Sequence, residues 1–328
     1  MTIQRTPPAP LIPRNKKDPT QSNKPVNRMR RDIEWRYHGI KTDLRELFDS
    51  QFSGRQVAGN SQKSALICNN DKEPPSLFWV NSGEYQYELD GADLARLFQR
   101  TQEILDAWLL DGGPDHIWTG EFIAAEYGRG TQSAFTSLAR QSEDYARQTT
   151  LSELLFSPEY QRRVGIAYLQ SYSHWKGISS KAQTDLANVI SDVVARGINP
   201  RATARIVSDR LDVSMSRAFN MAQTEQVGAY RQAIWDETED VQKRLGMRTA
   251  LLWLSALKPT TRAWHASRHG KTYSIDEVKA FYAKDGNRWN CYCSQQPILV
   301  DAQGKPLNTA LVERLYQERN EWIESLAA

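Results

Sequence analysis

The sequence predicts a predominantly helical α+β protein, in which a helical middle domain is followed by a small α+β module and a C-terminal helix. Three observations support this class. After Asp90, apolar residues recur at helical spacing over long stretches. Past Gly246 the apolar runs become short and are separated by turn residues, which is typical of strands. Helical spacing then returns over residues 308–325.

Residues 1–31 are predicted to form a basic, proline-rich, disordered arm. They hold six of the 14 prolines and eight Lys or Arg residues against one acid, although the whole chain has a formal net charge of only +3. Such a segment buries too little apolar surface to offset the entropy lost on ordering. Its basic residues are Arg5, Arg14, Lys16, Lys17, Lys24, Arg28, Arg30 and Arg31.

Clustered Lys and Arg residues release counterions when they bind nucleic acid. We therefore expect the arm to contact DNA or an acidic partner. A solubilising tail that binds nothing is the open alternative.

Residues 32–90 form a mixed N-terminal region with a short amphipathic stretch and a hairpin expected around residues 81–83. Residues 91–246 form the helical domain. Its first helix ends before Gly112 and Gly113, and glycine pairs of this kind commonly follow a helix. Further helices are expected at residues 119–147, 158–175, 181–196, 200–210 and 214–246.

Residues 247–303 are predicted to form the small α+β module, and residues 304–328 a C-terminal helix. The apolar run from Ala250 to Leu254 is expected to be a buried strand. It is far shorter than the roughly 20 apolar residues of a membrane helix, so no membrane segment is expected. Three cysteines give no even disulfide framework, which indicates a reducing compartment and assembly in the cytoplasm.

Two histidines and two cysteines in this module form a candidate structural zinc site: His265, His269, Cys291 and Cys293. On a helical turn, two histidines four residues apart share one face, so both can reach one ion. In a regular strand the two cysteines lie roughly 6.6 Å apart at Cα, which disfavours a disulfide. The alternatives are that the cysteines are small buried apolar residues and that the histidines bond to loop backbone.

No catalytic or nucleotide-binding arrangement is predicted. Glu225 is an acid within a predicted helix and is expected to accept structural hydrogen bonds. A nuclease would need clustered acids or a histidine flanked by metal ligands. A phosphate-binding loop would need a glycine-rich turn after a strand. The chain is therefore expected not to be an enzyme.

Three motifs in this order resemble the phage head morphogenesis family, the Mu F-like minor capsid proteins. The similarity covers roughly residues 120–305. The motifs are Arg217, Ala218, Ala222, Thr224 and Glu225; the turn from His265 to Gly270; and Asn290, Cys291 and Cys293. The resemblance implies a structural virion protein at the portal vertex of a tailed bacteriophage, with roles in head assembly and in DNA packaging or ejection. It also implies the portal protein as a partner, with the scaffold or major capsid protein as further candidates.

Two functions of another class remain as alternatives. One is a zinc-containing nuclease built on the same His and Cys residues. The other is a zinc-containing nucleic-acid-binding protein that uses the basic arm. A catalytic zinc keeps one position open for water, whereas four protein ligands would close its coordination shell. The four-residue set therefore favours a structural ion.

Overall fold

The computed structural model describes residues 8–51, 54–56 and 85–327. The chain forms two compact units. The first comprises Met1–Ile33, Asp111–His174 and Ala218–Ala328, and the second comprises Glu34–Leu110 and Trp175–Arg217. The predicted class, predominantly helical α+β, is confirmed. Cys68 and the hairpin expected around residues 81–83 lie outside the described residues.

Three long helices contribute residues to both units: α1 (Asn23–Gln51), α7 (Pro158–Ala195) and α8 (Pro200–Leu245). The other helices are α2 (Gly91–Leu109), α3 (Gly113–His116), α4 (Gly120–Gln141), α5 (Glu143–Gln148), α6 (Leu151–Leu155), α9 (Ala263–Ala266), α10 (Ile275–Ala283) and α11 (Thr309–Ala327). The strands are β1 (Gly54–Gln56), β2 (Tyr85–Tyr87), β3 (Thr249–Leu254), β4 (Thr272–Tyr273) and β5 (Ser294–Leu299).

The expected disordered arm is not what the structure shows over residues 8–31. Helix α1 begins at Asn23, whose N–H donates to Asp18 Oδ2 at 3.0 Å. The helix then buries Val26, Met29 and Ile33, which recur at helical spacing between the basic residues. Proline content and charge obscured this apolar stripe, which supplies the burial that a disordered segment lacks.

The segment before α1 also packs on the first unit. The Leu257 N–H donates to the carbonyl of Lys16 at 3.2 Å. The Ser294 hydroxyl donates to the carbonyl of Pro19 at 3.4 Å. Asp18 is buried, and its carboxylate accepts hydrogen bonds at the start of α1. Residues 14–22 are thus tied by hydrogen bonds to β5 and to the loop after β3.

Two breaks expected in the helical domain are absent. Helix α7 continues through Gly177, where the neighbouring Ser179 donates to the Asp106 carboxylate at 2.6 Å. Helix α8 continues through Ser214, which does not cap a helix but bonds the Tyr37 hydroxyl at 2.7 Å. Tertiary contacts therefore outweigh the weak local helix propensity of these residues.

The second unit consists of parts of α1, α7 and α8 with α2 and a two-stranded antiparallel sheet of β1 and β2. Helix α2 begins with a capping box formed by Asp90 and Asp93. Tyr87 of β2 donates its hydroxyl to the carbonyl of Ile198 at 2.6 Å. That bond fixes the sheet to the turn between α7 and α8.

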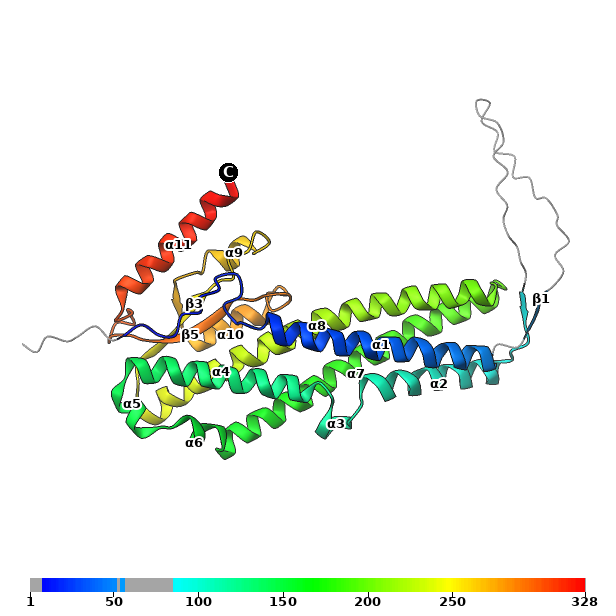
Figure 1. Ribbon diagram of the computed structural model, residues 1–328, viewed down its shortest axis with the longest axis horizontal. Helices are drawn as coiled ribbons and strands as arrows, with labels where there is room; N and C mark the ends of the chain where they lie inside the picture. The colour runs from blue at the N-terminus through cyan, green and yellow to red at the C-terminus, as the bar shows by residue number, and fades with distance from the viewer. Residues whose placement is uncertain (1–7, 52–53, 57–84, 328) are drawn as a thin grey trace, which may run out of the picture. The chain divides into compact units, whose positions relative to one another are not determined.

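The first unit contains a three-stranded antiparallel sheet in the order β4-β3-β5. Strands β3 and β5 lie side by side (Figure 1), and Leu251 of β3 stands opposite both Tyr273 and Pro297. Both of its faces are buried. Leu251 and Trp253 pack with residues of α8 and α10, including Trp235 and Val278. On the other face, Leu252, Leu254 and Ile298 pack with Leu311 and Leu315 of α11. This explains why β3 is a continuous apolar run.

Proline at position 297 fits its place in this sheet, because β5 is an edge strand and does not need every N–H to pair. The opposite edge of β5 meets α4, where Gln141 donates to the Pro297 carbonyl at 2.9 Å. In the part of the chain that the structure describes, no helix is long and apolar enough to cross a membrane.

Candidate metal centre

Arg231 of α8 is the residue that holds the cysteine pair in place. It is 2% exposed, and its Nε donates to the carbonyl of Cys293 at 2.8 Å. Its Nη2 donates to the carbonyl of Cys291. The guanidinium also lies 4.3 Å from the centre of the Tyr282 ring. Among the described residues, no carboxylate forms an ion pair with Arg231. The fork of one side chain therefore fixes two backbone carbonyls two residues apart.

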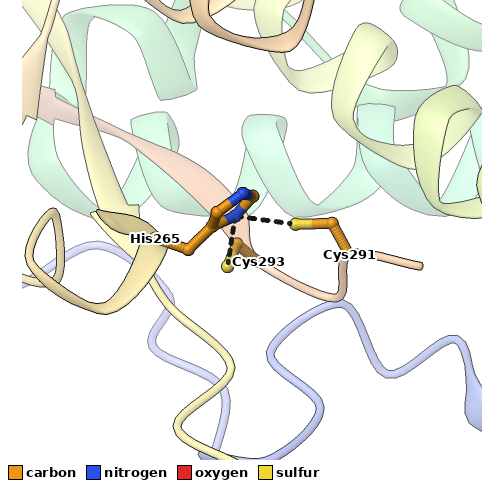
Figure 2. A group of neighbouring side chains, drawn as sticks. All are labelled: His265, Cys291 and Cys293. Carbon is orange, nitrogen blue, oxygen red and sulfur yellow. Dashed lines mark hydrogen bonds between the residues drawn. The ribbon is translucent and has the colours of Figure 1, made fainter. Parts of the chain in front are cut away.

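The backbone before the cysteines is turned at Asn290, which has a positive φ of 52°. Asparagine is one of the few residues that adopt this left-handed conformation readily. The turn brings the chain back into β5 at Ser294 and places both sulfurs toward His265 (Figure 2). Cys291 and Cys293 are free and buried. As predicted, the two cysteines form no disulfide with each other.

His265 reaches the same point from α9. Its carbonyl accepts a hydrogen bond from the Ser255 hydroxyl, just after β3. The loop that leads into α9 is joined to residues 286–289 by Arg262, whose guanidinium donates to the carbonyls of Asn287 and Trp289 at 3.0 and 2.9 Å. The three donor groups are thus supported by β3, α8 and the loop after α10.

The ring orientation of His265 is set by Asn287. The Asn287 amide nitrogen donates to the carbonyl of Phe281 at 3.0 Å, so its Oδ1 must face the other way. That oxygen accepts from Trp264 Nε1 at 2.8 Å and lies 3.4 Å from His265 Nε2. Nε2 is therefore assigned the proton. The lone pair of Nδ1 then points to the sulfurs, as in histidines that ligate metals.

The three donor atoms lie at separations that suit one ion. His265 Nδ1 is 3.3 Å from Cys291 Sγ and 3.7 Å from Cys293 Sγ, and all three atoms lie within 4.8 Å of one another. In a tetrahedral zinc site, ordinary bond lengths place nitrogen and sulfur roughly 3.6 Å apart. The residues present therefore fit a zinc-type ion.

The thiols are electrostatically unequal. Burial raises the pKa of the Cys293 thiol well above its ordinary value, and its hydrogen bond with Cys291 raises it further. Burial also acts on Cys291, but the hydrogen bond with Cys293 and the charge of Arg231 hold the pKa of Cys291 well below its ordinary value. One thiolate is thus stabilised next to one thiol, and thiolate is the form that binds metal.

His269 is not part of this group. The backbone N–H of Ser255 donates to its Nδ1 at 3.0 Å, so the ring carries its proton on Nε2. The nearest carboxylate oxygen, on Glu318, is 3.6 Å from Nε2, too far for a good hydrogen bond. Helix α9 ends at Ala266, so the two histidines do not share a helical face. The structure thus places His269 apart from the three donor residues, whereas the sequence suggested it as a fourth ligand.

The predicted arm residues occupy different environments. Arg5 lies outside the described residues. Arg30 is half-buried and reaches Gln223 of α8 at 3.4 Å. The other arm residues are exposed: Arg14, Lys16, Lys17, Lys24, Arg28 and Arg31. Lys24, Arg28 and Arg31 recur on one face of α1 and line a surface hollow beside Phe122.

Glu225 accepts structural hydrogen bonds, as expected. Its Oε2 accepts from Ser171 at 3.1 Å, and its Oε1 lies 2.8 Å from His174 Nδ1. These residues line a hollow of about 580 Å³ between α7, α8 and α10. Asp236 lines the same hollow and accepts from the Tyr127 hydroxyl and from Gln232. Both acids are therefore engaged with protein donors.

Several supporting residues could not be recognised in the sequence. Arg231 and Gln223 lie far from the cysteines in the sequence, and the contact between Arg231 and Cys293 spans 62 residues. Asn287 and Lys258 lie nearer to the donor residues but belong to no metal-ligand motif. The only signal for Arg231 was a basic residue on an otherwise apolar helix face, next to Tyr230 and Ile234. That pattern is too common to identify a site.

Part of the chain is similar to a known protein family. Residues 184–296 match the family described as Phage Mu protein F like protein. This part of the chain is therefore similar to the Mu F-like proteins. The resemblance inferred from sequence motifs is confirmed over these residues. No curated protein and no solved structure matches the chain.

The Mu F-like domain comprises the end of α7, all of α8 and the chain through β3, α9, β4 and α10 into β5. It contains all three donor residues and also Arg231. Residues 120–183 and 297–305, which the motif resemblance had included, lie outside the match. The candidate metal centre is therefore a feature of the matched domain and not of the flanking segments.

The buried His269 ring predicts a specific pH dependence of stability. Burial, with the nearby charges of Lys16 and Arg319, lowers the pKa of His269 from 6.5 to about 4. The folded state thus keeps the ring neutral where the unfolded state protonates it. The stabilisation is complete above about pH 6.5 and is lost as the pH falls toward 4, to a total of about 3 kcal/mol.

We expect His269→Gln to remove this slope. Urea unfolding of both proteins between pH 4 and 7 measures it as a difference in free energy of unfolding. Glu237, whose pKa burial raises to about 7, produces the opposite slope in the same range, but it is present in both proteins and cancels. Parallel pH curves for the two proteins would contradict the assignment.

Proposed function

We propose that this protein is a structural minor head protein of a tailed bacteriophage, located in the virion at the portal vertex and bound to the portal protein. The match of residues 184–296 to the Mu F-like family is the observation that carries the proposal. Contacts with the scaffold or major capsid protein and roles in DNA packaging or ejection belong to the same proposal.

The proposed role is not enzymatic. In a hydrolase, a carboxylate or histidine would be poised to activate water beside the metal. Within the described residues that line the cavity next to the donor group, there is no Asp or Glu. The acids of the larger hollow, Glu225 and Asp236, already accept hydrogen bonds from the protein. These contacts favour a structural role over a nuclease.

We also propose zinc as the ion held by His265, Cys291 and Cys293. Two thiolate sulfurs and an imidazole are soft to intermediate ligands, which zinc accepts readily in tetrahedral geometry. The buried guanidinium of Arg231 stabilises the negative charge that the thiolates need. The ion would join the loop before β5 to α9, two segments that share no strand pairing.

Portal binding is tested with the two purified proteins. We expect the tagged chain to retain portal oligomers of the same phage through gel filtration and to release no product from nucleic-acid or peptide substrates. Portal oligomers of an unrelated phage provide the control for nonspecific capture. A folded chain, verified by circular dichroism, that never co-elutes with its own portal would refute the proposal.

The basic face of α1 favours DNA as a second partner. Lys24, Arg28 and Arg31 are exposed on one helix face, and among the described residues that line the hollow beside them Glu121 is the one acid. Each phosphate contact contributes to the salt dependence of binding. The face is therefore suited to the duplex backbone, without sequence preference.

We expect the triple variant Lys24→Ala, Arg28→Ala, Arg31→Ala to bind duplex DNA more weakly. The slope of log K against log salt should fall by about 2 to 3, as measured by fluorescence anisotropy. The control is Arg201→Ala, Arg205→Ala, Arg210→Ala, which removes the same charge from exposed positions of α8. Equal losses in both variants would show a net-charge effect and rule out a DNA-binding face on α1.

A further inference from the structure

A cavity of about 240 Å³ lies directly beside the three donor residues. It is lined by His265, Cys291 and Cys293 together with Gln223, Ala256, Lys258, Thr260, Thr261, Arg262, Asn290 and Tyr292. Three protein donors leave one position of a tetrahedral ion without a protein ligand. Since His269 is turned away, the cavity is where a fourth ligand would enter.

The cavity contains an unpaired hydrogen-bond donor. Gln223 is 3% exposed, and its Oε1 accepts from Arg30 at 3.4 Å. Its Nε2 is buried and has no hydrogen-bond partner among the described residues. A buried amide donor without an acceptor costs roughly 1–3 kcal/mol. An acceptor in the cavity would remove that penalty.

The cavity is also positively charged. The ammonium of Lys258 lies 3.5 Å from the centre of the Tyr292 ring and, within the described residues, forms no ion pair. Arg262 lines the same cavity, although its guanidinium donates to loop carbonyls. The nearby carboxylate of Asp18 is occupied by donors from Thr20, Ser22 and Asn23.

The net charge around the ion also favours an anionic ligand. A zinc ion with two thiolates and one neutral imidazole is neutral overall. Arg231 is then left as a buried cation, and buried charge is costly unless it is compensated. Lys258 of the adjoining cavity adds a second positive charge, which Asp18 offsets in part. An anionic fourth ligand supplies the missing negative charge.

We propose that this cavity binds an oxyanion, a carboxylate or a phosphate, as the fourth ligand of the ion held by His265, Cys291 and Cys293, with Gln223 and Lys258 as its hydrogen-bond donors. This inference rests on the zinc site proposed above. It converts a closed four-residue site into one with three protein ligands and an exchangeable position. The anion would be donated by a partner or by the medium and not by the described part of this chain.

Cobalt spectroscopy of the full chain tests the proposal. Cobalt(II) replaces zinc, and its visible and thiolate charge-transfer bands report on the number and type of ligands. Titration of inorganic phosphate and, separately, of acetate into the cobalt protein should shift the visible bands in a saturable way. A response to phosphate alone assigns a phosphoryl group, one to acetate alone assigns a carboxylate, and responses to both assign oxyanions in general.

Two variants probe the donors without touching the metal ligands. Gln223→Leu and Lys258→Met should each weaken anion binding by about tenfold or more, while the thiolate charge-transfer bands remain. Lys305→Met, an exposed lysine outside the cavity, is the matched control and should bind as the unaltered chain does.

These measurements test the metal centre and the oxyanion site separately. Folded protein that develops no thiolate-to-cobalt bands would overturn the metal centre and, with it, the anion as a metal ligand. Thiolate bands with visible bands that ignore both anions would overturn the oxyanion site and leave the metal centre intact. Unchanged anion affinity in both cavity variants would also overturn the site as described.

Discussion

The guanidinium of Arg231 is the contact on which the candidate centre depends. A fully buried cation costs several kcal/mol to desolvate, and only well-formed interactions offset that cost. Here the offset comes from two charge-assisted hydrogen bonds to the carbonyls of Cys291 and Cys293 and from the Tyr282 ring. Because both carbonyls are fixed to one rigid fork on α8, the two sulfurs project in a defined direction toward His265.

The rest of the first unit makes that contact possible. The sheet is covered on one face by α8 and α10 and on the other by α11, so β3 and β5 cannot move relative to α8 without exposing apolar surface. Trp253 stacks on Tyr282 with ring centres 5.3 Å apart, and Tyr282 in turn covers Arg231. Apolar packing thus excludes water from the cation, which strengthens its hydrogen bonds.

Much of this architecture was predictable from sequence, for identifiable reasons. β3 and α11 were recognised because their apolar patterns match the periods of a strand and a helix. The start of α1 was missed because proline and charge dominated the interpretation, although Val26, Met29 and Ile33 carried the helical pattern. The continuity of α7 and α8 depends on contacts such as those of Ser179 and Ser214, which no local signal specifies.

The candidate metal centre likewise combines residues that the sequence indicated with residues that only tertiary contacts bring in. The structure brings His265 together with Cys291 and Cys293, three of the four residues that the sequence suggested as ligands. His269 lies outside this group, because its ring accepts a hydrogen bond from the backbone of Ser255. Gln223 belongs to α8, so only the folded chain brings it to the cavity, whereas Lys258 lies in the loop just before α9.

The affinity for zinc of Arg231→Lys, compared with that of Arg248→Lys, tests the central claim most directly. Lysine keeps the charge but lacks the fork, and Arg248 is an exposed arginine just before β3. Chelator competition should give tight binding of about one zinc per chain for the unaltered protein and for Arg248→Lys, and an affinity about 10- to 100-fold lower for Arg231→Lys. Equal zinc affinity in the two variants, or folded unaltered protein that binds no zinc, would contradict the account.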